Sequence, residues 1–168
     1  MRPNPKDHIP YYSNYIDLVP EADVISALKA NHQATLDFIE SIPRLKANYF
    51  YDTGKWTVKQ VVNHIIDTER IFGYRALRFA RGDNQLLPGF DENLYAANAN
   101  LTETNMQLLM DEFDSVRLSN VLMFKQLTSK ELLLKGKTAS GEVNVLSLGY
   151  MMCGHAIHHV NVIKERYL

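Results

Sequence analysis

The sequence predicts an all-α fold: a bundle of four long helices with a long crossover between the second and the third. Apolar side chains recur at helical spacing in four stretches, about residues 20–42, 58–81, 103–127 and 145–167. Residues 82–101 show no helical period. A connection of about 20 residues is long for antiparallel neighbours, and is typical of bundles in which consecutive helices run the same way or lie apart. A chain of 168 residues is long enough to bury the core of one domain.

The first 43 residues predict an arm followed by a helix. Residues 1–19 are rich in proline and tyrosine and have no period, so we expect an extended N-terminal arm on the surface of the bundle. Pro20 suits the first turn of a helix, and Glu21 and Asp23 suit the positive end of its dipole. Pro43 ends this helix.

The second helix has the clearest beginning and end. Thr57 and Gln60 form a capping box, in which each side chain bonds the backbone of the other residue. Gly82 is placed to end the helix in a left-handed conformation. His64 lies in its apolar part, where a histidine is more often a hydrogen-bonded core residue than a metal ligand.

The second half of the chain predicts two further helices separated by a polar loop. Thr102 is placed to cap the third helix, and Asn144 to cap the fourth. Residues 136–142 are predicted to be the polar loop between them. In the crossover, Asp91 and Tyr95 are polar side chains that could lie over the mouth of a site, which makes them weak catalytic candidates.

Composition excludes several classes of function. The formal net charge of −1 favours neither nucleic acid nor an anionic membrane as a partner. Four arginines of the second helix are interpreted as a solvated face or an anion-attracting rim: Arg70, Arg75, Arg78 and Arg81. The single cysteine, Cys153, allows no intrachain disulfide. With no signal-peptide pattern and no apolar run of about 18 residues, we expect a cytoplasmic protein.

The last predicted helix contains three of the six histidines, all within a span of five residues. His155 and His159 are one helical turn apart and border the apolar side of the helix. His158 falls on its polar side. Periodicity therefore selects His155 and His159 as a pair of ligands for one ion, and His64 of the second helix is the candidate for the third.

Three histidines from two helices could hold a divalent metal ion. Neutral imidazoles suit zinc, nickel, copper or iron. Three protein ligands leave coordination positions for water or substrate, which is typical of a catalytic metal and not of a structural one. The alternative is a polar patch between helices that binds no metal.

Two segments resemble a known family. Residues 54–67, Gly-Lys-Trp-Thr-Val-Lys-Gln-Val-Val-Asn-His-Ile-Ile-Asp, resemble the second-helix signature of the DinB-like (YfiT-like) four-helix-bundle superfamily. Residues 154–159, Gly-His-Ala-Ile-His-His, resemble its C-terminal histidine motif. Residues 15–19 and 87–91 also resemble its metal-binding branch.

The resemblance implies one DinB-like domain over residues 1–168, with up-down-down-up topology. It implies that His64, His155 and His159 hold a divalent ion, zinc or nickel, in a cytoplasmic homodimer. Members of the metal-binding branch transfer low-molecular-weight thiols such as bacillithiol, mycothiol or glutathione to electrophiles through a metal-bound thiolate. The alternatives are a metal-dependent hydrolase with a metal-bound water, and a helical dimer that binds a ligand without catalysis. The resemblance implies a small-molecule substrate but identifies no thiol-specific pocket residue. Asp91, Tyr95 and the helix-two arginines are candidates for recognising a carboxylate or for contacting the metal ligands from outside.

Overall fold

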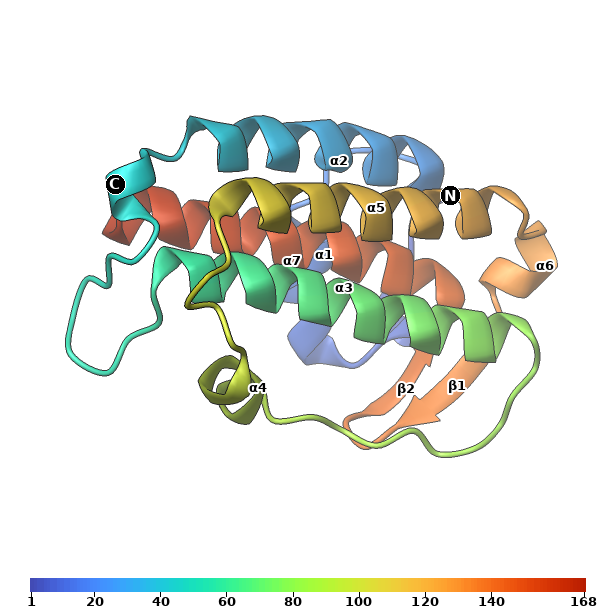
Figure 1. Ribbon diagram of the computed structural model, residues 1–168. Helices are drawn as coiled ribbons and strands as arrows, with labels where there is room; N and C mark the ends of the chain where they lie inside the picture. The colour runs from blue at the N-terminus through green and yellow to red at the C-terminus, as the bar shows by residue number, and fades with distance from the viewer.

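The computed structural model describes residues 1–168 and confirms a four-helix bundle (Figure 1). Its long helices are α2 (Val24–Ser41), α3 (Val58–Ala80), α5 (Met106–Lys125) and α7 (Val145–Arg166). In Figure 1, α2 and α7 run in one direction and α3 and α5 in the other, which is up-down-down-up topology. Helices α2 and α3 each pack against α5 and α7, so the consecutive helices α2 and α3 lie diagonally across the bundle.

Two helix starts follow the predicted caps and two differ. Thr57 and Gln60 form the capping box of α3, and Asn144 accepts from the amide of Ser147 at the start of α7. Helix α2 begins at Val24 and not at Pro20, because the carboxylate of Asp23 accepts from the first free amides.

The third long helix begins later than predicted. Asn105, and not Thr102, caps α5, since its side chain accepts from the amide of Leu108. The preceding helix α3 ends as predicted, with Gly82 at φ 76°. No helix of the protein has both the length and the apolar character needed to span a bilayer.

The two predicted loops contain secondary structure. The crossover includes a short helix, α4 (Glu92–Asn98), and the predicted loop 136–142 belongs to a hairpin of β1 (Lys135–Thr138) and β2 (Gly141–Asn144) that follows α6 (Ser129–Leu132). The crossover pairs with this hairpin through Leu87, whose amide donates to the Lys137 carbonyl at 2.9 Å. The hairpin packs tightly because Gly136 lies where a Cβ would come within 1.9 Å of the Phe79 ring.

The N-terminal arm is less extended than predicted. It contains two 3₁₀ turns, η1 (Pro5–Asp7) and η2 (Pro10–Tyr12), and one turn of helix, α1 (Ser13–Ile16). The arm packs on α7, because Gly154 has no Cβ and lets the Tyr15 carbonyl approach: a Cβ there would lie 2.0 Å from that oxygen. His8, the one histidine of the arm, is buried.

A polar layer divides the core into two apolar clusters. The guanidinium of Arg117, 0% exposed, donates to the two carboxylate oxygens of Glu69 at 2.7 and 2.9 Å. Arg117 also donates to Asn31 at 2.6 Å, and Asn120 donates to Glu69 at 2.9 Å. Each of the four residues is buried. One apolar cluster surrounds the start of α7 and the end of α3, and the other surrounds the opposite ends of these helices.

Candidate metal centre

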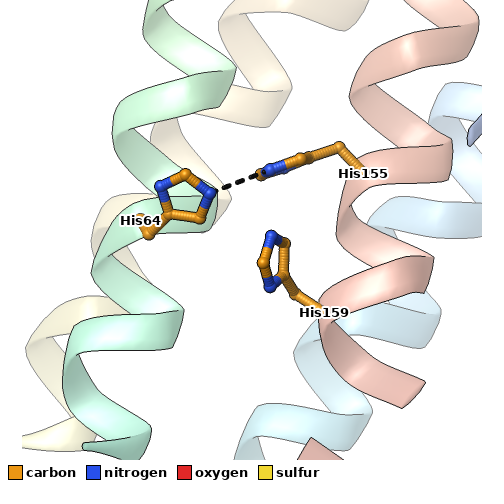
Figure 2. Close-up of side chains that lie close together, drawn as sticks. All are labelled: His64, His155 and His159. Carbon is orange, nitrogen blue, oxygen red and sulfur yellow. Dashed lines mark hydrogen bonds between the residues drawn. The ribbon is translucent and has the colours of Figure 1, made fainter. Parts of the chain in front are cut away.

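The structure brings His64, His155 and His159 together between α3 and α7 (Figure 2). One ring nitrogen from each lies within 4.8 Å of the others. His155 and His159 project from successive turns of α7, and His64 faces them from the antiparallel helix α3. The Nε2 atoms of His64 and His155 are 3.0 Å apart. Helix α3 lies beside α7 because the connection from α2 to α3, residues 42–57, crosses the bundle diagonally.

This geometry fits one divalent ion. Nitrogen ligands about 2.0–2.1 Å from zinc lie about 3–3.5 Å from one another. The His64–His155 separation already meets this requirement. His159 needs only a small side-chain adjustment, because its ligand nitrogen lies within the same 4.8 Å group.

The electrostatics of the site also suit a metal. Burial lowers the pKa of His64 to about 4 and that of His159 to about 3. The pKa of His155 is lowered by burial first, and then by the neighbouring imidazoles. All three rings are therefore neutral at pH 7, with lone pairs available for an ion.

Metal-free protein is expected to lose stability as the pH falls from about 6.5 towards 4. The unfolded chain takes up protons on these imidazoles near pH 6.5, whereas folded His64 does so only near pH 4. The unfolded state holds more protons in this window, so acid favours it. His64 alone would contribute roughly 3 kcal/mol. Urea unfolding of metal-free protein across this range measures the loss.

A His64→Leu variant provides the control for this pH dependence. It removes one of the three titrating imidazoles, so its stability should fall less steeply with acid. Stability that does not change between pH 6.5 and pH 4 in the unsubstituted protein would contradict the assignment of three neutral, buried rings.

A pocket of about 370 Å³ opens in front of the three histidines. Six tyrosine, tryptophan and phenylalanine side chains line it: Tyr11, Tyr12, Tyr15, Trp56, Phe72 and Phe90. They come from the N-terminal arm, from α3 and the residues just before it, and from the crossover. A ligand at an open position of the metal would therefore enter an aromatic cavity.

Tyr15 and Glu92 are pocket residues that were not singled out individually from the sequence. The Tyr15 ring lies edge-on to His155 and His158, with centroids 5.6 and 5.5 Å apart. Burial, and then the hydrogen bond with Tyr11, raises the pKa of Tyr15, so its phenol stays protonated. Glu92 supplies an exposed carboxylate at the pocket. The signal for Glu92 was available: Asp91 followed by Glu92 is a helix-start pattern.

The two catalytic candidates from the crossover lie elsewhere. Asp91 caps α4 by accepting from the amides of Asn93 and Leu94. Tyr95 lines a different pocket, together with Asn63 and Asp67 of α3. Neither lines the pocket in front of the histidines. Asp91 and Tyr95 were chosen only because they lie in the crossover. The crossover residue that lines the pocket with a carboxylate is Glu92, the first residue of α4.

His158 and Cys153 lie beside the three histidines without joining them. His158 is exposed, as its place on the polar side of α7 predicts, and it borders the pocket mouth. Cys153 is fully buried, and burial raises the pKa of its thiol to about 12. That thiol stays protonated at neutral pH, so it is unsuited to act as a nucleophile.

Comparison with known families shows to which family this chain belongs. Residues 27–163 match the family described as the DinB superfamily. The chain belongs to the DinB superfamily. No curated protein matches this DinB protein significantly.

Among solved structures, this DinB protein is similar to YfiT from Bacillus subtilis. The two share 15% sequence identity, with a TM-score of 0.68 over 98% of this chain and 90% of the other. YfiT is described as a probable metal-dependent hydrolase with an unusual four-helix bundle topology. At this level of identity the likeness shows a common fold.

Proposed function

We propose that this DinB protein is a divalent-metal-dependent enzyme that transfers a low-molecular-weight thiol to an electrophilic small molecule. One observation carries the proposal: three neutral imidazoles converge from one side, and a pocket lined by aromatic rings lies on the other. A zinc or nickel ion held by His64, His155 and His159 would supply a Lewis acid that lowers the pKa of a coordinated thiol.

The pocket residues have distinct roles in this reaction. The aromatic walls bind a planar, apolar electrophile. Glu92 accepts the thiol proton, and the Tyr15 phenol donates a hydrogen bond to the reacting group. With a haloaromatic substrate, a carbon–sulfur bond forms, the carbon–halogen bond breaks, and halide leaves. The thiol comes from solution, because Cys153 is buried and protonated.

The test is conjugation of glutathione to 1-chloro-2,4-dinitrobenzene by zinc- or nickel-loaded protein without an affinity tag. We expect thioether formation above the uncatalysed rate, and its loss in His159→Ala. Because thiols differ among organisms, cysteine and bacillithiol are assayed beside glutathione. Fully metal-loaded protein that is inactive with all three would contradict the transfer reaction.

Hydrolysis is the second candidate, favoured by the exposed carboxylate of Glu92 beside the histidines. A carboxylate in that place can take a proton from an attacking water. The description of the similar YfiT as a probable metal-dependent hydrolase agrees with this alternative. Turnover of p-nitrophenyl acetate by metal-loaded protein in the absence of any thiol would separate hydrolysis from thiol transfer.

A further inference from the structure

The arginines of α3 do not share one environment. Arg70 pairs with Glu112 at 2.6 Å, Arg78 pairs with Asp83, and Arg81 approaches Glu131 at 3.7 Å. These three fit the solvated face predicted from the sequence. Arg75 does not: its side chain turns inward, only 6% of the residue is exposed, and it lines the pocket in front of the histidines.

The guanidinium of Arg75 has no acidic partner. None of the salt bridges of the protein includes Arg75. Its one hydrogen bond to protein runs from Nη2 to the Pro88 carbonyl at 3.0 Å. Its Cζ lies 6.0 Å from the centre of the Phe90 ring. A guanidinium has five N–H groups, so most of its donors are left for something that enters the pocket.

Buried arginines are normally neutralised, as the same protein illustrates. Arg117 is also buried, and it forms a bidentate ion pair with the carboxylate of Glu69. Taking a charge out of water without such a partner is unfavourable. Accordingly, burial lowers the pKa of Arg75. The bond to Pro88 anchors the crossover, but one neutral carbonyl does not balance a positive charge.

A second polar group on the same wall also lacks a partner. Thr68 lies one turn after His64 on α3, is 2% exposed, and lines the same pocket. Its hydroxyl has no hydrogen-bond partner. His64, Thr68 and Arg75 are spaced by four and seven residues, which places them along one face of the helix. Their wall therefore leads from the metal ligands to the arginine.

We propose that Arg75 binds the carboxylate of an anionic substrate whose reacting end lies at His64, His155 and His159. The Cα atoms of residues 64 and 75 are about 16 Å apart along an ideal helix, and side chains lean back towards its N-terminus. The substrate is thus an elongated molecule with an aromatic or apolar middle. This inference rests on the proposed function for which end reacts, whereas carboxylate binding is measurable without turnover.

The test is calorimetric titration of zinc-loaded protein with 4-phenylbutyrate and with its neutral amide, 4-phenylbutyramide. We expect the acid to bind at least about tenfold more tightly, as for one charge-assisted contact. Arg75→Met should abolish this preference while leaving amide binding intact. Arg81→Gln is the matched control, because it removes an exposed arginine of the same region and should keep the preference.

Each outcome decides the proposal. Equal affinity of the unsubstituted protein for acid and amide, both in this phenyl pair and in the mercapto pair described below, would overturn it. A preference that persists in Arg75→Met would also overturn it, since the carboxylate would then be contacting the metal. If Arg75→Met loosens the crossover and lowers the melting temperature, Arg75→Gln removes the charge but keeps an N–H donor for the Pro88 carbonyl; a lost preference then supports the proposal and an unchanged one contradicts it.

The anion could belong to the electrophile or to the thiol. Titration of the same zinc-loaded proteins with 3-mercaptopropionate and 3-mercaptopropionamide distinguishes the two sources. Dependence on Arg75 for the phenyl pair alone assigns the carboxylate to the electrophile, and dependence for the mercapto pair alone assigns it to the thiol. If the metal-loaded protein does not transfer thiols but still prefers the acid over the amide through Arg75, the proposed reaction is contradicted and the carboxylate site at Arg75 is not.

Discussion

His159→Ala is expected to weaken binding of Zn²⁺ by the folded protein by about 100-fold or more. Zinc-binding free energies of about 10–16 kcal/mol for four-ligand sites correspond to roughly 3 kcal/mol per ligand. His159 is one of the three side chains that could hold the ion, and the remaining pair, His64 and His155, would leave it with too few contacts. Competition with a chromophoric chelator at pH 7, using protein without an affinity tag, measures the change.

His158→Ala is the matched control for this experiment. It removes the same chemical group one residue earlier, from the exposed side of α7. We expect it to keep the zinc affinity of the unsubstituted protein. Zinc should also raise the melting temperature of the control and not that of His159→Ala, since the ligands meet only when α3 and α7 are packed. Equal zinc affinity in the two variants would contradict the three-histidine site.

Arg117→Met is expected to lower the free energy of unfolding by about 3–5 kcal/mol. Removing this guanidinium leaves the carboxylate of Glu69 inside the bundle with only Asn120 as a side-chain donor. Glu69 is 2% exposed, so water cannot replace the lost contact without local opening. Urea unfolding of metal-free protein at pH 7 measures the loss.

Two controls separate burial from charge pairing in this experiment. Arg70→Met breaks an exposed pair with Glu112, 2.6 Å long, and should cost no more than about 1 kcal/mol. The double variant Glu69→Leu with Arg117→Met removes both charges, and should be more stable than Arg117→Met alone. Similar losses for Arg117→Met and Arg70→Met would show that the polar layer adds little to stability.

The helices and the histidine set were accessible from sequence because both depend on local spacing. Apolar periodicity predicts four long helices, and the capping residues Thr57 and Asn144 mark two of their starts. On a helical wheel, His155 and His159 fall at the edge of the core, and His158 falls outside it. The structure places these side chains accordingly.

Other features were not accessible because they depend on contacts between distant segments. The sequence around Arg75 does not distinguish it from Arg78. In the structure, however, Arg75 is buried and donates to the Pro88 carbonyl, whereas Arg78 pairs with Asp83. Glu69 and Arg117 are 48 residues apart, and in the sequence each looks like a surface charge. Only the packing of α3 against α5 shows that they form a buried pair. The hairpin was missed because Gly136 departs from strand preferences, and packing against Phe79 overrides that local bias.

The contact between Trp56 and His64 gives the protein an optical reporter. Trp56 is the only tryptophan of the chain, and its ring centroid lies 5.0 Å from that of His64. An ion with an open d shell, such as Co²⁺, Ni²⁺ or Cu²⁺, should quench tryptophan emission on binding to His64, whereas Zn²⁺ should not. Loading of the centre can therefore be followed in real time without a label, and the two kinds of ion can be distinguished by fluorescence.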